Sequence, residues 1–100
     1  MSDRIYTRKE LKDMICPLVK KYNATDALLF GSYARNEATP DSDIDVIIIG
    51  GNQFSSTDIF AIAEELFEAS GKQVDVYELQ EVNIGSPLYE SIMREGVALQ

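Results

Sequence analysis

Apolar residues recur at helical spacing in the first quarter of the chain and predict an amphipathic helix. Thr7 and Glu10 stand at the spacing of a capping box, so we expect this helix to begin at Thr7. Pro17 lies inside the pattern and predicts a kink, or a split near residues 15–16, and Asn23 is the expected end. The apolar stripe consists of Leu11, Met14, Ile15, Leu18, Val19 and Tyr22.

The rest of the chain alternates short apolar runs, bounded by turn residues, with stretches of helical periodicity. The predicted strands are residues 27–30, 43–49 and 74–79. The further predicted helices are residues 32–38, Ser55 to Gly71, and Ser86 to Gly96. This order predicts one α/β (α+β) domain over residues 1–100, with a sheet of about three strands flanked by helices.

Charge and missing residue types narrow the chemistry. The chain has 9 Lys+Arg and 17 Asp+Glu, a net charge of −8, which argues against strong binding to nucleic acid. It has no histidine, which excludes Ser-His and Cys-His nucleophile pairs and imidazole acid–base catalysis. Catalysis must therefore rest on carboxylates, hydroxyls, the few cations and metal ions.

The sequence also indicates a compartment. No apolar run approaches the roughly 20 residues of a membrane span, and the N-terminus lacks the apolar segment of a secretory signal. Hydrophobic residues make up 45% of the chain, enough for a packed core. The single cysteine, Cys16, excludes an internal disulfide framework and fits a reducing environment. We expect a cytoplasmic protein without a membrane partner.

A Gly-Ser pair follows the first predicted strand. Gly31 allows the backbone to turn sharply and to approach a ligand closely. If a helix begins at Ser32, its free N–H groups form a site for a phosphate. The alternative is an ordinary strand-to-helix turn that binds nothing.

Three aspartates follow in the next two predicted strands. Asp43 and Asp45 share one face of a strand, about 6.5–7 Å apart, and Mg²⁺ would relieve their repulsion. If the third strand lies parallel beside the second, Asp75 is level with Asp45, and three carboxylates could hold two metals. The alternatives are solvent-exposed aspartates at a frayed strand start and, for Asp75, on an edge strand.

Taken together, Gly31-Ser32, Asp43-x-Asp45 and a later strand aspartate resemble the nucleotidyltransferase superfamily that includes the DNA polymerase β palm. Residues 30–49 resemble its signature, G-S-x-A-R-G…S-D-I-D-hydrophobic, with Asn36 where the family usually has glycine. Because asparagine tolerates positive φ, we expect the turn to survive. At this length the chain is most similar to the minimal nucleotidyltransferases, whose partners are HEPN-domain toxins. The resemblance implies their palm-like fold with a small mixed sheet.

The resemblance also implies roles for particular residues. Asp43, Asp45 and Asp75 would be catalytic and would bind two Mg²⁺ ions, while Gly31 and Ser32 would hold the β- and γ-phosphates of a nucleoside triphosphate. Arg35 would reach a phosphate, or would form only a surface ion pair. Asp75 is a candidate base because no histidine is available.

The implied reaction is transfer of AMP from ATP to a hydroxyl of a HEPN-domain partner protein, as the antitoxin of a toxin–antitoxin pair. At this length we expect no room for an acceptor domain, so we expect a partner, or a second copy of the chain, to complete the site. One alternative is a non-catalytic antitoxin that neutralises its partner by binding alone. Its docking surface would be the apolar C-terminal segment Leu88, Ile92, Met93, Val97 and Leu99, which ordinary core packing also explains. A small-molecule transferase is a third alternative.

Overall fold

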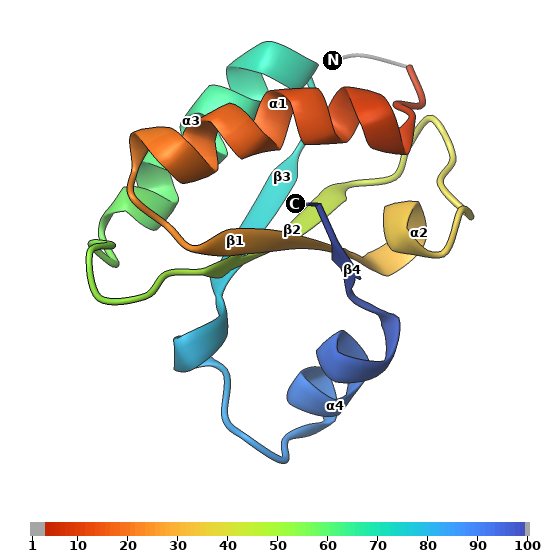
Figure 1. The fold of residues 1–100 in the computed structure, drawn as a ribbon. Helices are drawn as coiled ribbons and strands as arrows, with labels where there is room; N and C mark the ends of the chain where they lie inside the picture. The colour runs from red at the N-terminus through yellow and green to blue at the C-terminus, as the bar shows by residue number, and fades with distance from the viewer. Residues whose placement is uncertain (1–3, 100) are drawn as a thin grey trace.

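The computed structural model describes residues 4–99, which form a single four-stranded sheet with helices on both faces (Figure 1). The helices are α1 (Arg8–Lys21), α2 (Gly31–Ala34), α3 (Asp58–Ser70), the 3-10 turn η1 (Leu79–Glu81) and α4 (Pro87–Glu95). The strands are β1 (Asp26–Phe30), β2 (Ile44–Ile49), β3 (Val74–Glu78) and β4 (Val97–Ala98).

The sheet is mixed, as expected, with the strand order β3-β2-β1-β4. β1 runs antiparallel to β2 and to β4, whereas β2 and β3 are parallel and are joined through α3. Helices α1 and α3 cover one face and α4 lies on the other (Figure 1). The predicted fold class is confirmed, but β4 was not predicted because a two-residue strand carries no periodic signal.

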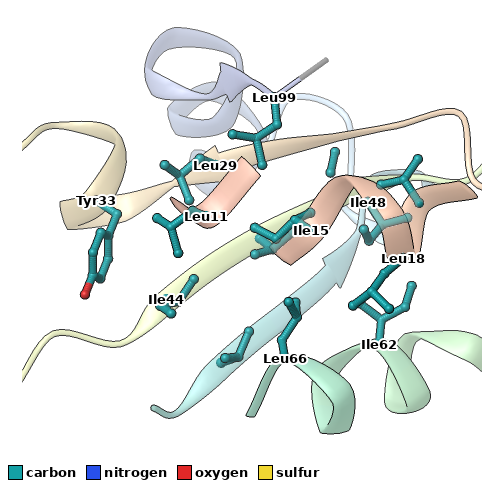
Figure 2. Close-up of a cluster of buried hydrophobic side chains, with 14 of the residues drawn as sticks. Leu11, Ile15, Leu18, Leu29, Tyr33, Ile44, Ile48, Ile62, Leu66 and Leu99 are labelled. Atoms are coloured by element: carbon teal, nitrogen blue, oxygen red, sulfur yellow. The ribbon is translucent and has the colours of Figure 1, made fainter. Parts of the chain in front are cut away.

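Alternation along β2 divides its side chains between the two faces of the sheet. Ile44, Val46 and Ile48 are buried against α1 and α3, in the cluster of Figure 2. Ile47 points to the α4 face and is also fully buried. The next position toward the strand start on the α4 face is Asp45, which is only half-buried. The apolar part of this face therefore gives way to a carboxylate at the beginning of β2.

The capping box at the start of α1 is present: the Thr7 hydroxyl accepts from the Glu10 amide, and the Glu10 side chain accepts from the Thr7 amide. The predicted split near Pro17 is wrong, because α1 is one continuous helix from Arg8 to Lys21. Pro17 lacks only the N–H that would bond the carbonyl of Asp13. Burial of four apolar side chains offsets that loss: Leu11, Ile15, Leu18 and Val19.

Replacing Pro17 with alanine should stabilise the protein, because Pro17 is exposed and its substitution restores the missing helical hydrogen bond. We expect the free energy of unfolding to rise by about 1–2 kcal/mol, after subtraction of the gain in unfolded-state entropy. Urea unfolding measures this. Pro87→Ala is the matched control, since Pro87 occupies the first turn of α4 and costs no hydrogen bond there. Equal effects of the two substitutions would contradict the explanation.

Local sequence signals predicted some of the other element boundaries correctly and missed others. Gly71 ends α3 in the left-handed conformation, Ser86 caps α4 through its hydroxyl, and Gly96 follows α4, all as predicted. The helix predicted over residues 32–38 ends earlier, at Ala34, because Asn36 adopts a φ of 59°. The third helix begins at Asp58 instead of Ser55, whose carbonyl accepts from the Asp58 amide in a preceding turn.

Between residues 4 and 99, no helix combines the length and the apolar character that crossing a bilayer requires.

Candidate active site

The candidate site lies where β1 ends and where β2 and β3 begin. Phe30, Asp45 and Asp75 stand in one row across these three strands, because Phe30 pairs with Asp45 and Asp45 pairs with Asp75. Parallel pairing in this register places the two aspartates on the same face of the sheet. The alignment expected from the sequence is therefore present, and it depends on the crossover through α3.

Asp45 and Asp75 interact directly. The pKa of Asp45 is raised from 3.8 to about 6, first by burial and then by the negative charges of Asp75 and Asp43. A protonated Asp45 carboxyl can also hydrogen-bond to Asp75, which raises the same pKa further. Gln73 Nε2 donates to Asp75 Oδ1 over 3.4 Å. Folding has thus brought two carboxylates together without enough nearby positive charge from the protein to neutralise them.

Asp43 contributes at longer range. It is exposed, one residue before β2, and its charge raises the pKa of Asp45. Within residues 4–99, no group of three or more His, Cys, Asp and Glu side chains stands close enough together to hold a metal ion. The structure therefore brings Asp45 and Asp75 into contact and leaves Asp43 exposed, just before the start of β2. The three carboxylates of the predicted site are not gathered around one point in this structure.

The donor set nevertheless suits a hard cation. Asp45 and Asp75 offer only carboxylate oxygens, the ligands that Mg²⁺ prefers. Burial and the charges of Asp75 and Asp43 raise the pKa of Asp45, and a bound cation would offset both effects in place of a proton. The residues present therefore fit Mg²⁺, which one or two carboxylates hold together with waters or substrate phosphates.

The Gly-Ser turn lies directly against the carboxylate of Asp45. Gly31 has a φ of 71°, and a Cβ atom built on it would overlap Oδ2 of Asp45. Glycine is thus required at this position for two reasons: the left-handed backbone and the close approach of the Asp45 carboxylate. Ser32 follows, half-buried, and its hydroxyl makes no hydrogen bond within the part of the chain that the structure describes. The hydroxyl of Ser32 is therefore available to a ligand.

Arg35 is exposed and is held by two carboxylates. Its Nε donates to Glu37 over 3.0 Å and its Nη1 to Glu95 on α4 over 3.4 Å. Its charge also lowers the pKa of Asp45 slightly against the larger opposing effects. The surface ion pair expected as one alternative is present, and binding of a phosphate by Arg35 stays a prediction.

Sequence reasoning missed two residues on this face. Gln73 and Tyr77 flank Asp75 at a spacing of two, so strand alternation was the signal that could have found them. Burial, followed by the charges of Asp75 and Asp45, raises the pKa of the Tyr77 hydroxyl. By contrast, Tyr33, which follows Ser32, is buried in the core (Figure 2).

The raised pKa of Asp45 should make the metal-free protein less stable as the pH rises. The folded state holds this proton with a pKa of about 6 against an ordinary value of 3.8, so it binds more protons than the unfolded state between those values. The contribution of Asp45 to the free energy of unfolding is therefore full below about pH 4 and is lost as the pH rises through about 6. Urea unfolding in a chelator, compared with Asp45→Asn, isolates this contribution. Parallel pH curves for the two proteins would contradict it.

A mixed sheet that carries a carboxylate pair beside a Gly-Ser turn has the architecture of a nucleotidyltransferase. The protein-family model described as "Polymerase beta, Nucleotidyltransferase" matches residues 13–100. The chain belongs to this family and is an enzyme of the nucleotidyltransferase class.

One relative and two solved structures are similar to this chain. A protein of Methanocaldococcus jannaschii named a protein adenylyltransferase is 40% identical over 88 residues, which span 88% of this chain and 92% of the relative. A crystal structure of a toxin–antitoxin complex with AMP-PNP superposes with a TM-score of 0.76 at 22% identity, over 89% of this chain and 72% of the other. A complex of a tri-AMPylated HEPN toxin of Shewanella oneidensis with an MNT antitoxin gives 0.71 at 20% identity, over 94% and 72%.

Proposed function

We propose that this protein transfers AMP from ATP, with Mg²⁺, to a hydroxyl of a HEPN-domain partner protein, and that it is the antitoxin of such a pair. The observation that carries the proposal is the close approach of Gly31, in the Gly-Ser turn, to the carboxylate of Asp45, which lies beside Asp75. This contact places candidate metal ligands directly beside a candidate phosphate site.

The roles of the residues follow from this arrangement. The Gly31-Ser32 turn and Ser32 Oγ bind the β- and γ-phosphates, and Arg35 adds positive charge nearby. Asp43, Asp45 and Asp75 hold two Mg²⁺ ions, which supply activation of the acceptor hydroxyl and neutralisation of the leaving pyrophosphate. Asp75 accepts the proton of the hydroxyl as its oxygen bonds to the α-phosphorus and the bond to pyrophosphate breaks.

Three observations support a protein acceptor. The relative from Methanocaldococcus jannaschii is named for transfer to a protein, and the two complexes contain toxins, one of them AMPylated. The net charge of −8 disfavours a nucleic-acid acceptor. Tyrosine is the hydroxyl residue that we propose as the target.

The free Cys16 thiol suits the reducing cytoplasm, where we place the reaction.

Mass spectrometry of the partner provides the test. The protein encoded by the neighbouring gene is purified after expression alone, with the wild-type chain, and with the double variant Asp43→Ala, Asp45→Ala. We expect a gain of one or more AMP masses with the wild-type chain only, and Mg²⁺-dependent release of pyrophosphate from ATP in the purified system. An unmodified partner with the wild type, or equal modification with the double variant, would refute the proposal.

The second candidate is a non-catalytic antitoxin. Leu88 and Met93 on α4 remain 38% and 49% exposed, and so are available to a partner, whereas Ile92 and Leu99 of the same segment belong to the core. The double variant separates the candidates, because full neutralisation of the toxin by a catalytically inactive chain would show that binding suffices.

A further inference from the structure

Tyr77 lies on the candidate active-site face and is not buried in the core. It follows Asp75 by two positions on β3, and it pairs in register with Ile47 just as Asp75 pairs with Asp45. Its side chain is 39% exposed, although Ile47 beside it is completely buried. The charges of Asp75 and Asp45 both act on its hydroxyl. A large aromatic side chain therefore stands open to solvent next to the carboxylate pair.

The strand order sets the direction from which an acceptor must approach. The Gly-Ser turn follows β1, on one side of Asp45, and Asp75 lies on β3, on the other side. In an in-line displacement the attacking oxygen and the leaving pyrophosphate lie on opposite sides of the α-phosphorus. If the pyrophosphate leaves over the Gly-Ser turn, the acceptor hydroxyl arrives over β3, which is the edge of the sheet in the described structure.

We infer that Tyr77 is a specificity-determining residue that contacts the acceptor: its exposed ring packs against the partner-protein segment that carries the reactive hydroxyl. The inference rests on the proposed function and deepens it by assigning the acceptor side of the site. Exposed tyrosines are suited to this role, because they bury much apolar area with few rotatable bonds and keep a hydroxyl for hydrogen bonding.

A contact with the donor nucleotide is the competing role for the same ring, since bases stack on tyrosine. The two roles separate in steady-state kinetics. A residue that contacts only the acceptor changes the KM for the partner protein, whereas a stacking residue changes the affinity for ATP. Phe60 provides a matched control, because it is an aromatic residue, 78% exposed, on α3 across the sheet from the site.

The experiment compares wild type, Tyr77→Ala, Tyr77→Phe and Phe60→Ala in Mg²⁺-dependent AMP transfer to the purified partner. For Tyr77→Ala we expect the KM for the partner to rise about tenfold or more, with unchanged ATP affinity by calorimetry and an unchanged unfolding midpoint. Tyr77→Phe should recover most of the loss, because it keeps the ring, and Phe60→Ala should match wild type.

Other outcomes overturn the inference in distinguishable ways. Weaker ATP binding by Tyr77→Ala with an unchanged KM for the partner would assign the ring to the nucleotide. Wild-type kinetics for Tyr77→Ala would remove Tyr77 from the site while the proposed function stands. Failure of the wild-type chain to modify the partner would overturn both. Should Tyr77→Ala fail to fold, Tyr77→Leu keeps the apolar bulk and tests the same KM.

Discussion

Asp45→Asn is expected to abolish AMP transfer and, at the same time, to make the metal-free protein more stable. Asparagine has the shape of aspartate without its charge. It therefore removes a metal ligand together with the burial of a charge and the repulsion from Asp75 and Asp43, which raise the pKa of Asp45 to about 6. We expect the rate to fall by about 10³-fold or more, which corresponds to about 4 kcal/mol of transition-state stabilisation. The free energy of unfolding at neutral pH should rise by about 1–2 kcal/mol, a value reduced for the partial exposure of the site.

Pyrophosphate release and urea unfolding at pH 7, with and without Mg²⁺, measure both effects. Asp41→Asn is the control, because Asp41 is an exposed aspartate of the same acidic stretch, in the turn before β2. It should change neither quantity by much. Added Mg²⁺ should stabilise the wild-type protein and should stabilise Asp45→Asn far less. An active Asp45→Asn protein would contradict the assigned role, and a destabilised one would contradict the electrostatic explanation.

Gly31→Ala is expected to damage both the fold and the reaction. The substitution forces a side chain into a backbone with a φ of 71° and places its Cβ where Oδ2 of Asp45 lies. The backbone conformation costs about 1–2 kcal/mol, and displacing the carboxylate brings the total loss of stability to about 2–4 kcal/mol. The rate should fall by about 10²-fold or more, because the Asp45 carboxylate is displaced from its position.

Gly85→Ala separates these two costs. Gly85 also has a positive φ, of 85°, but a Cβ atom there would meet nothing within 4 Å. We expect a loss of only about 1–2 kcal/mol and no loss of activity. The difference between the two variants in urea unfolding then measures the close approach of Gly31 to Asp45. Equal losses would show that backbone conformation alone requires glycine at position 31.

Signals carried by a few neighbouring residues predicted much of the fold. Thr7 with Glu10, Gly71, and Ser86 with Pro87 marked helix ends correctly, since capping and left-handed turns are settled by local hydrogen bonds and local sterics. Asn36 likewise adopts the positive φ expected of an asparagine in a glycine position. The family was recognisable because its signature lies within one short segment, residues 30–49.

Features that depend on distant contacts were not predictable in this way. The continuity of α1 through Pro17 results from burial of the helix against the sheet. β4 exists because Val97 and Ala98 pair with β1, far away in the chain. The carboxylate site is intermediate: the sequence supplied Asp45 and Asp75 as candidates, and only their parallel register makes them neighbours.

By itself, then, the amino-acid sequence determined the class of enzyme, several of the helix ends and the identity of the charged and glycine residues beside the site. The tertiary structure alone decided which of those residues touch: Asp45 meets Asp75 and Gly31, Asp43 stays at the rim, and Arg35 is bound by Glu37 and Glu95. The physical reason is the distance along the chain over which each kind of interaction acts. Capping and turn preferences act over three or four residues, whereas pKa values and contacts between strands depend on residues that folding brings together.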